Sequence, residues 1–350
     1  MATDRSAFAS DGPSPGAAPT RDTRVHSEVP ELLSDYSRYD FRSRWSGRDR
    51  VTEVERAVVA RAFDGVRLDR VLDIGSSYGR LVGALGSIAS HVTVVDLDIS
   101  ALRCMDPREV PVPLTRVAAN LFHLPFPSES FSGGAMVRVY HHLAQPEAAL
   151  SEIARVLRPG GRFLVSYNPT PSVGTIVNDL GLALRNGTHE RWFPVTRARR
   201  RVAVDHDAFP LFAAPRCDFE GVARSAGLRP VGEFGTGFEE YRVLRRAPAA
   251  FFLRLGMGLH RAPGFPARFA VLEKPGRSGP DPEGDAERFA CPVCRTPISG
   301  WEENHDPVCA RCGFRGNGVE GVLDLRYVSP TAEFRGPGSR PSGPPRSQDA

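Results

Sequence analysis

The stretch VLDIGSSYGR, residues 71–80, decides the fold of this chain. An apolar run ends in an acid at Asp73, and a turn that contains Gly75 and Gly79 opens into a predicted helix over residues 79–88. A strand, a glycine-containing turn and a helix in this order are typical of nucleotide-binding α/β proteins. The stretch therefore raises the question of which nucleotide the chain binds.

Composition and charge exclude several classes of protein. With 350 residues, of which 41% are hydrophobic, the chain can bury a large core and a smaller one. The formal net charge of +4 is too small to predict a nucleic-acid partner. No apolar run has the length of a membrane span, and the N-terminus lacks the apolar core of a signal peptide. We therefore expect a cytoplasmic protein without a membrane span.

Composition also divides the chain. The N-terminal residues, the end of the chain and an internal stretch rich in Pro, Gly and Asp have too few apolar residues to offset their chain entropy. The predicted organisation is a disordered tail (1–28), a catalytic body (29–275), a flexible linker (276–288), a cysteine-bearing module (289–330) and a second disordered tail (331–350).

Strands and helices alternate through the body. Apolar residues at helical spacing predict helices over 50–62 and 150–157, in addition to the helix over 79–88. Short apolar runs predict strands over 70–74, 91–95, 114–120, 133–140 and 162–167. Such alternation predicts an α/β fold with a doubly wound parallel sheet, which binds its ligand at the carboxyl ends of the strands.

A second acid, Asp96, ends the next strand 23 residues after Asp73, where a carboxylate can accept both hydroxyls of a ribose. The Gly-x-Gly-x-x-Gly pattern that brings backbone amides against a pyrophosphate is absent, since the glycines of GSSYG are four apart. The acid before the first glycine would also repel a pyrophosphate. A cofactor without phosphates and with a positive centre fits this turn better.

Five segments in order resemble the motifs of class I S-adenosylmethionine-dependent methyltransferases, in particular the small-molecule branch that includes quinone-biosynthesis enzymes. They are VLDIGSSYGRL, VTVVDLD, HLPFPSESF, HHL with PEAALSEIARVLRPGGRFLVSYNP, and FEGVARSAGLRPV with RFAVLEKP, spread over residues 50–275. The resemblance implies a Rossmann-like methyltransferase fold. It also implies that Asp73, Gly75 and Gly79 surround the methionine part of the cofactor, that Asp96 binds the ribose, that Asn120 meets the adenine amino group and that Leu121 packs on the ring.

The chain departs from this family at the first turn. Ser77 stands where the family has a glycine, and this side chain is expected to crowd the cofactor. Asn120 replaces the usual Asp, but its amide oxygen can accept the same hydrogen bond.

Four cysteines form two knuckles in the second module. Cys291 and Cys294, then Cys309 and Cys312, give a C-x2-C…C-x2-C array with fourteen residues between the pairs. Four thiolates predict a closed, structural zinc site with one ion per chain, rather than two disulfides. The residues that follow resemble the end of a small zinc-ribbon domain that partners and activates some methyltransferases.

Methyl transfer requires alignment of the acceptor with the methyl group, and a general base only where the acceptor must lose a proton. We predict His141, at the end of the fourth strand, as that base, with His142 as the second choice. The acceptor is expected beneath residues 36–45 and 168–215, because irregular segments carry specificity in such folds.

Three functions from different classes fit the sequence. The first is a methyltransferase that acts on a small molecule of natural-product or saccharide type. The second is a methyltransferase for rRNA or tRNA, because zinc ribbons accompany some such enzymes. Against it, the ribbon has few basic residues and an acidic run at Glu302, Glu303 and Asp306. The third is a non-catalytic binding protein that keeps the fold.

Overall fold

The structure is a computed structural model of the 350-residue chain. It describes residues 32–34, 41–66, 68–186, 200–204, 211–241, 244, 246–277, 289–298 and 306–335. No helix in these ranges is long and apolar enough to cross a membrane. The predicted tail 1–28, residues 278–288 of the predicted linker and residues 336–350 lie outside the described part.

One sheet dominates the described residues, and its centre is parallel. β2 pairs with β3 and β5, β4 lies beyond β3, and β6 lies beyond β5, all in parallel. β10 pairs with β6 and β9 pairs with β10, both antiparallel. The predicted parallel sheet is therefore confirmed for the five central strands, and two antiparallel strands extend it. The strands are β2 (Leu68–Ile74), β3 (Ala89–Asp96), β4 (Leu114–Ala118), β5 (Phe131–Met136), β6 (Leu157–Thr170), β9 (Arg229–Thr236) and β10 (Ala267–Glu273).

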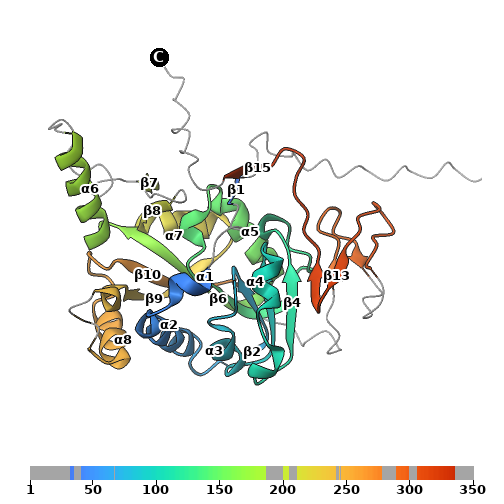
Figure 1. Cartoon of the computed structure of the whole chain (residues 1–350), viewed down its shortest axis with the longest axis horizontal. Helices are drawn as coiled ribbons and strands as arrows, with labels where there is room; N and C mark the ends of the chain where they lie inside the picture. The colour runs from blue at the N-terminus through green and yellow to red at the C-terminus, as the bar shows by residue number, and fades with distance from the viewer. Residues whose placement is uncertain are drawn as a thin grey trace, which may run out of the picture. The chain divides into compact units, whose positions relative to one another are not determined.

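Helices cover both faces of the sheet (Figure 1). Because successive strand residues point to opposite faces, Val71 packs with α2, α3 and α4, whereas Leu72 packs with α5 and α7. The predicted doubly wound arrangement is confirmed. The helices are α1 (Phe41–Trp45), α2 (Asp49–Ala62), α3 (Val82–Gly86), α4 (Ile99–Arg103), α5 (Pro146–Val156), α6 (Val173–Asn186), α7 (Arg216–Ser225) and α8 (Ala249–Gly258).

Some predicted boundaries differ from the structure. The helix predicted over 79–88 is limited to Val82–Gly86, and the strand predicted over 133–140 is β5, Phe131–Met136. Gly133 and Gly134 lie inside this strand because neighbouring strands approach them closely. A Cβ atom on Gly134 would lie 2.3 Å from the carbonyl oxygen of Leu72.

The C-terminal region adds strands to the main sheet. β14 (Val322–Asp324) pairs in parallel with β4, and β13 (Asn317–Val319) forms a hairpin with β14, which Figure 1 shows beside β4. Leu323 and the cysteines Cys291 and Cys309 belong to the same buried apolar cluster as Leu72. The shorter strands are β1 (Leu32–Ser34), β7 (Val202–Val204), β8 (Leu211–Pro215), β11 (Phe289–Ala290), β12 (Pro297–Ile298) and β15 (Glu333–Arg335).

This arrangement differs from the predicted separation of body and ribbon. The strands of the ribbon are two or three residues long and cannot bury an apolar core among themselves, so they share the core of the sheet. The predicted disorder from residue 331 also differs from the structure, since Glu333–Arg335 pair in parallel with Leu32–Ser34. Residues 289–298 and 306–325 therefore pack as part of the body.

Candidate functional site

The turn after β2 forms one wall of a cavity at the carboxyl ends of the parallel strands. The backbone amide of Gly75 donates to the carbonyl of Val95 at 2.8 Å and ties the turn to β3. Gly75 has a φ of 68°, and a Cβ atom there would lie 2.2 Å from Cγ2 of Val139, so only glycine fits. Gly79 has a φ of 86° and packs against Met105, outside the cavity lining.

Two carboxylates, the buried Asp73 and the half-buried Asp96, line the cavity from adjacent strand ends. Asp73 is 3% exposed, and burial raises the pKa of its carboxyl to about 7, with Arg80 lowering and Asp96 raising that pKa. The carboxylate of Asp96 accepts hydrogen bonds from the backbone amides of Ser77 at 2.8 Å and Asp98 at 3.0 Å. Burial raises the pKa of Asp96 above its usual value, although these two hydrogen bonds lower it. The site thus offers two carboxyl groups whose ionised forms a ligand with positive or hydroxyl groups would favour.

The structure brings most of the predicted cofactor residues together. Asp73, Gly75, Asp96, Asn120 and Leu121 all line this cavity, whereas Gly79 does not. The full lining consists of Leu33, Trp45, Asp73, Ile74, Gly75, Ser76, Ser77, Tyr78, Arg80, Leu81, Val95, Asp96, Leu97, Ala119, Asn120, Leu121, Phe122, Val137, Arg138, Val139, His142 and Leu143.

Two hydroxyls in the turn are available to a ligand. The Oγ atoms of Ser76 and Ser77 are buried and have no hydrogen-bond partner among the described residues. Because a buried hydroxyl without a partner is unfavourable, these atoms fit a cavity that a polar ligand fills. Ser77 also has a φ of 48°, a backbone conformation that disfavours residues other than glycine.

An ion-pair network lies beside the cavity and contributes Arg80 and Arg138 to its lining. Glu55, which is 1% exposed, pairs with Arg80 and with Arg138, whose Nε lies 2.7 Å from Oε1 of the glutamate. Burial disfavours the Glu55 carboxylate, but the two guanidinium groups hold its pKa below the usual value. Both arginines stack on the ring of Trp45, at 3.9 Å and 5.1 Å from its centroid. Cationic and aromatic groups therefore line the same cavity as the two acids.

The histidine pair lies at the same end of the sheet. A short 3-10 helix, Tyr140–His142, follows β5, and Tyr140 is 1% exposed. His142 lines the cavity, whereas His141, the predicted base, is not among the lining residues. The two imidazole rings lie 4.2 Å apart between centroids. Of the two histidines, His142 is therefore the better placed to accept a proton from a ligand in the cavity.

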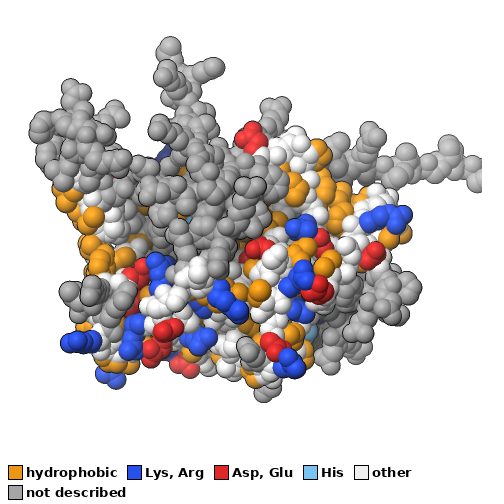
Figure 2. Space-filling model, viewed as in Figure 1, with side chains coloured by type: hydrophobic (Ala, Val, Ile, Leu, Met, Phe, Trp, Pro, Cys, Tyr) orange, Lys and Arg blue, Asp and Glu red, His pale blue; other side chains and the backbone are white. Residues whose placement is uncertain are grey.

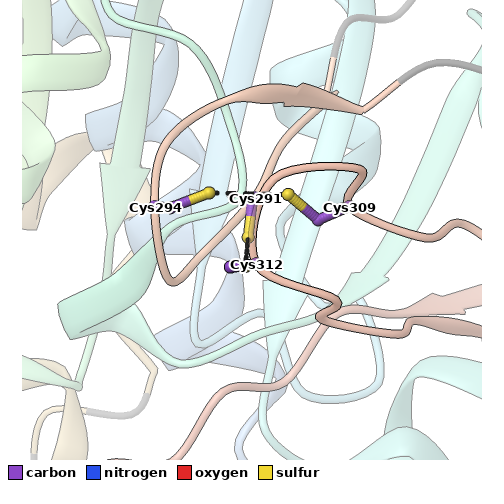
Figure 3. A group of neighbouring side chains, drawn as sticks. All are labelled: Cys291, Cys294, Cys309 and Cys312. Atoms are coloured by element: carbon purple, nitrogen blue, oxygen red, sulfur yellow. Dashed lines mark hydrogen bonds between the residues drawn. The ribbon is translucent and has the colours of Figure 1, made fainter. Parts of the chain in front are cut away.

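The four predicted metal ligands converge in the structure (Figure 3). Their Sγ atoms all lie within 4.8 Å of one another, with Cys291 and Cys312 at 3.5 Å and Cys294 and Cys309 at 3.4 Å. A tetrahedral zinc with Zn–S bonds of about 2.3 Å needs sulfur atoms about 3.8 Å apart. The four thiols therefore fit a zinc ion with small adjustments.

The sequence interpretation missed part of this site. Glu55 and Arg138 are 83 residues apart and belong to no local motif, although Arg80 ends the quoted first stretch. Trp45 lies in the segment predicted for the acceptor and lines the cavity. The rest of that prediction falls partly on residues 36–40, 187–199 and 205–210, which lie outside the described residues.

Comparison with known proteins gives the same region a family likeness. Residues 72–165 match the family model described as a methyltransferase domain. An uncharacterised methyltransferase of Mycobacterium bovis is 30% identical over 103 residues, covering 29% of this chain and 52% of the relative. A demethylmenaquinone methyltransferase of Clavibacter sepedonicus is 29% identical over 123 residues, covering 34% and 49% respectively. The chain spans about half the length of the curated relatives that it matches.

Two solved structures are similar over a larger share of the chain. A complex between the Haloferax volcanii Trm112 methyltransferase activator and a putative methyltransferase gives a TM-score of 0.44 at 18% identity, covering 68% of this chain and 97% of the other. A putative S-adenosylmethionine-dependent methyltransferase from Listeria monocytogenes gives 0.46 at 13% identity, covering 65% and 100%. The family likeness of this chain is to methyltransferases, and it is concentrated in residues 72–165, which supply most of the cavity.

Proposed function

We propose that this chain is an S-adenosylmethionine-dependent methyltransferase that acts on a small-molecule acceptor. The observation that carries the proposal is the pair of acids, the buried Asp73 and the half-buried Asp96, in one cavity beside a tight glycine turn. An ammonium group and ribose hydroxyls would satisfy these carboxylates, whereas a pyrophosphate would be repelled by them. The match of residues 72–165 to a methyltransferase domain supports the same proposal.

Each wall of the cavity then has a role in binding. Asp73 is proposed to hold the ammonium group and Asp96 the ribose hydroxyls, while Asn120 and Leu121 flank the adenine. Arg80 is a cation in the same lining, where it lowers the pKa of Asp73, and it is suited to a carboxylate. Its own ion pair with Glu55 holds the guanidinium in place.

S-adenosylmethionine supplies an activated methyl group on a sulfonium centre. Held by Asp73 and Asp96, it would supply this methyl group to an acceptor lone pair with loss of the sulfur–carbon bond, and the acceptor would give up a proton. The described chain contributes alignment, exclusion of water and, at His142, a group that can take this proton. We propose His142 as the base because it faces the cavity.

The acceptor end of the cavity favours a small apolar or aromatic molecule. Leu33, Trp45 and Leu143 line the cavity together with the polar residues. On the face shown in Figure 2, Lys and Arg side chains are interspersed with Asp and Glu rather than gathered into the basic stripe typical of RNA-binding surfaces. Several relatives are named for a small-molecule acceptor, demethylmenaquinone.

We propose zinc as the ion held by the four cysteines, in a structural role. Cys291 and Cys309 are 0% and 1% exposed. Four sulfur ligands complete a tetrahedral shell, so no coordination position stays open for substrate.

Methyl transfer from labelled S-adenosylmethionine tests the proposed function. The full chain is incubated with labelled cofactor and cell extract, and the products are separated into a low-molecular-weight fraction and an RNA fraction. We expect label in the low-molecular-weight fraction with the parent chain, and a strong reduction with Asp73→Asn. Label in RNA alone would replace the small-molecule assignment with the RNA one. Absence of any transfer, with cofactor binding retained, would favour a binding protein.

A further inference from the structure

The side chain of Asn120 connects the ligand cavity to the C-terminal region. This residue follows β4 and is fully buried, at 0% exposure. Its Oδ1 atom accepts a hydrogen bond from the backbone amide of Phe122 at 3.1 Å, and its Nδ2 atom donates to the carbonyl of Tyr327 at 3.1 Å. Asn120 and Phe122 both line the cavity. One amide group thus fixes the shape of a cavity wall and holds a segment 207 residues away in sequence.

The segment that carries Tyr327 runs along β4 to reach this point. β14 pairs with β4 in parallel, with Leu323 opposite Val117 and Asp324 opposite Ala118. The amide of Leu325 continues the ladder by donating to the carbonyl of Ala118 at 2.9 Å. The ring of Tyr327 then packs edge-on against His123 at 4.9 Å between centroids. The contact with Asn120 is therefore the end of a continuous strand interaction.

The same strand is connected to the four-cysteine cluster. Leu323 and Leu325 lie in one buried apolar cluster with Cys291 and Cys309. Arg295, between the two knuckles, donates to the carbonyl of Leu124 at 2.8 Å and pairs with Glu152 at 2.6 Å. Disorder at the cysteines would therefore weaken the packing of β14 and the contacts of the segment that follows Phe122.

The chemistry at Tyr327 requires an amide on Asn120. A carbonyl oxygen accepts hydrogen bonds only, and the amide donor of asparagine satisfies it. A carboxylate of the same shape would place an acceptor against an acceptor in a buried position, which is strongly unfavourable. An aspartate at position 120 is therefore compatible with the cavity but incompatible with this C-terminal segment.

We infer that residues 325–328 are a structural part of the ligand site, and that Asn120 is the positioning residue that couples the four-cysteine region to the nucleoside end of the cavity. This inference rests on the proposed function for the identity of the probe ligand. When the segment is docked, Tyr327 holds the Asn120 side chain in the orientation that shapes the Asn120–Phe122 wall. When the metal is removed, the segment loosens and the cavity loses that wall. Coupling between two sites is reciprocal, so a ligand in the cavity also strengthens metal binding.

The test uses the full chain and S-adenosylhomocysteine as the probe, with dissociation constants measured by isothermal titration calorimetry. Removal of the metal by a chelator is expected to weaken binding of the probe about tenfold, within the 5- to 150-fold range common for coupled sites. Asn120→Asp with the metal present is expected to weaken binding by a similar factor. Metal removal from Asn120→Asp should then add little, because the coupling is already lost. Asn317→Asp, the same chemical change at an exposed position of β13, is the matched control and should stay within about twofold of the parent.

The reciprocal measurement uses only the parent and so does not depend on the folding of a variant. Saturating S-adenosylhomocysteine should raise the apparent zinc affinity, measured by competition with a chromogenic chelator, by the same factor of about ten. The inference is overturned if the parent binds the probe equally well with and without metal and its zinc affinity is the same with and without the probe. That result leaves the proposed function standing. A parent that does not bind the probe at all overturns both.

Discussion

The turn at residues 75–79 and the cysteine region at 289–298 and 306–325 were both predicted from sequence, yet they relate differently to the rest of the fold. The turn is hydrogen-bonded to the adjacent strand. It lies at the carboxyl ends of the parallel strands, where sheets of this kind bind their ligands. The cysteine region has a local metal motif but depends on a distant sheet for its core. A motif therefore predicts chemistry well, while the independence of a module must be judged from its apolar content.

The largest expected effect is loss of one cysteine ligand. Structural zinc contributes about 10–16 kcal/mol of binding free energy in small zinc peptides. Because Cys309 lies in the core shared with the sheet, Cys309→Ser should lower the free energy of unfolding of the whole body by at least about 5 kcal/mol, half the lower end of that range. Chemical denaturation and zinc content give the measurement, and Cys104→Ser, at an exposed cysteine, is the control. A body that unfolds at the parental midpoint after zinc loss would show the ribbon to be a separate module.

A smaller effect is expected from a core truncation in β14. Leu323 is 1% exposed and lies opposite Val117 in the sheet. Leu323→Ala should lower the free energy of unfolding by about 2–5 kcal/mol, because a cavity remains in the shared core. Val308→Ala, at a side chain that is 42% exposed, should change it by less than about 0.5 kcal/mol. If Leu323→Ala unfolded in two separate transitions and only the first differed from that of the parent, the two regions would not share a core.

Asp73 tests the turn rather than the cysteine region. Asp73→Asn should weaken S-adenosylhomocysteine binding by about 1.5–3 kcal/mol, since a charge-assisted hydrogen bond is lost. In the ligand-free chain the same change should raise stability at pH 8. The reason is that the folded-state pKa of about 7 exceeds the usual 3.8, so the folded state loses stability as pH rises from 3.8 to 7.

The same pKa predicts a pH dependence of binding. The ligand's cation needs the ionised carboxylate, so affinity should fall as pH drops below 7. Between pH 7.5 and 5.5 the parent should lose about 20-fold in affinity, whereas Asp73→Asn should lose much less. Titration calorimetry at both pH values measures this, and an equal pH dependence in the two proteins would remove Asp73 from the ligand site.

The smallest expected effect concerns Ser77. Its φ of 48° costs a non-glycine residue about 1–2 kcal/mol. Ser77→Gly relieves that strain, offset in part by the entropy of glycine in the unfolded chain, so stability should rise by up to about 1 kcal/mol. Thermal unfolding measures the change, with Ser87→Gly, outside the turn, as the comparison. A decrease in stability would mean that the Ser77 hydroxyl has a compensating role.

The sequence predicted the sheet and much of the cavity because those features have local signals. Asp73 and Asp96 each end an apolar run, and strand ends gather at one edge of a parallel sheet. The four cysteines were found by their spacing alone, and their Sγ atoms do converge.

Other features depend on contacts that no local pattern encodes. The Glu55–Arg138 pair joins α2 to the end of β5, and Asn120 meets a carbonyl on Tyr327 near the C-terminus. The choice between His141 and His142 depends on the direction of a single turn of 3-10 helix, which sequence periodicity does not define over three residues. Those residues became interpretable only with the packing in view.

Titration calorimetry of the full, metal-loaded chain with S-adenosylhomocysteine and, separately, with NAD tests the central claim most directly. The two acids in the cavity and the glycine turn predict one S-adenosylhomocysteine bound per chain and no detectable binding of NAD, whose pyrophosphate would face Asp73. Binding of NAD, or failure of the parent chain to bind S-adenosylhomocysteine, would contradict the account.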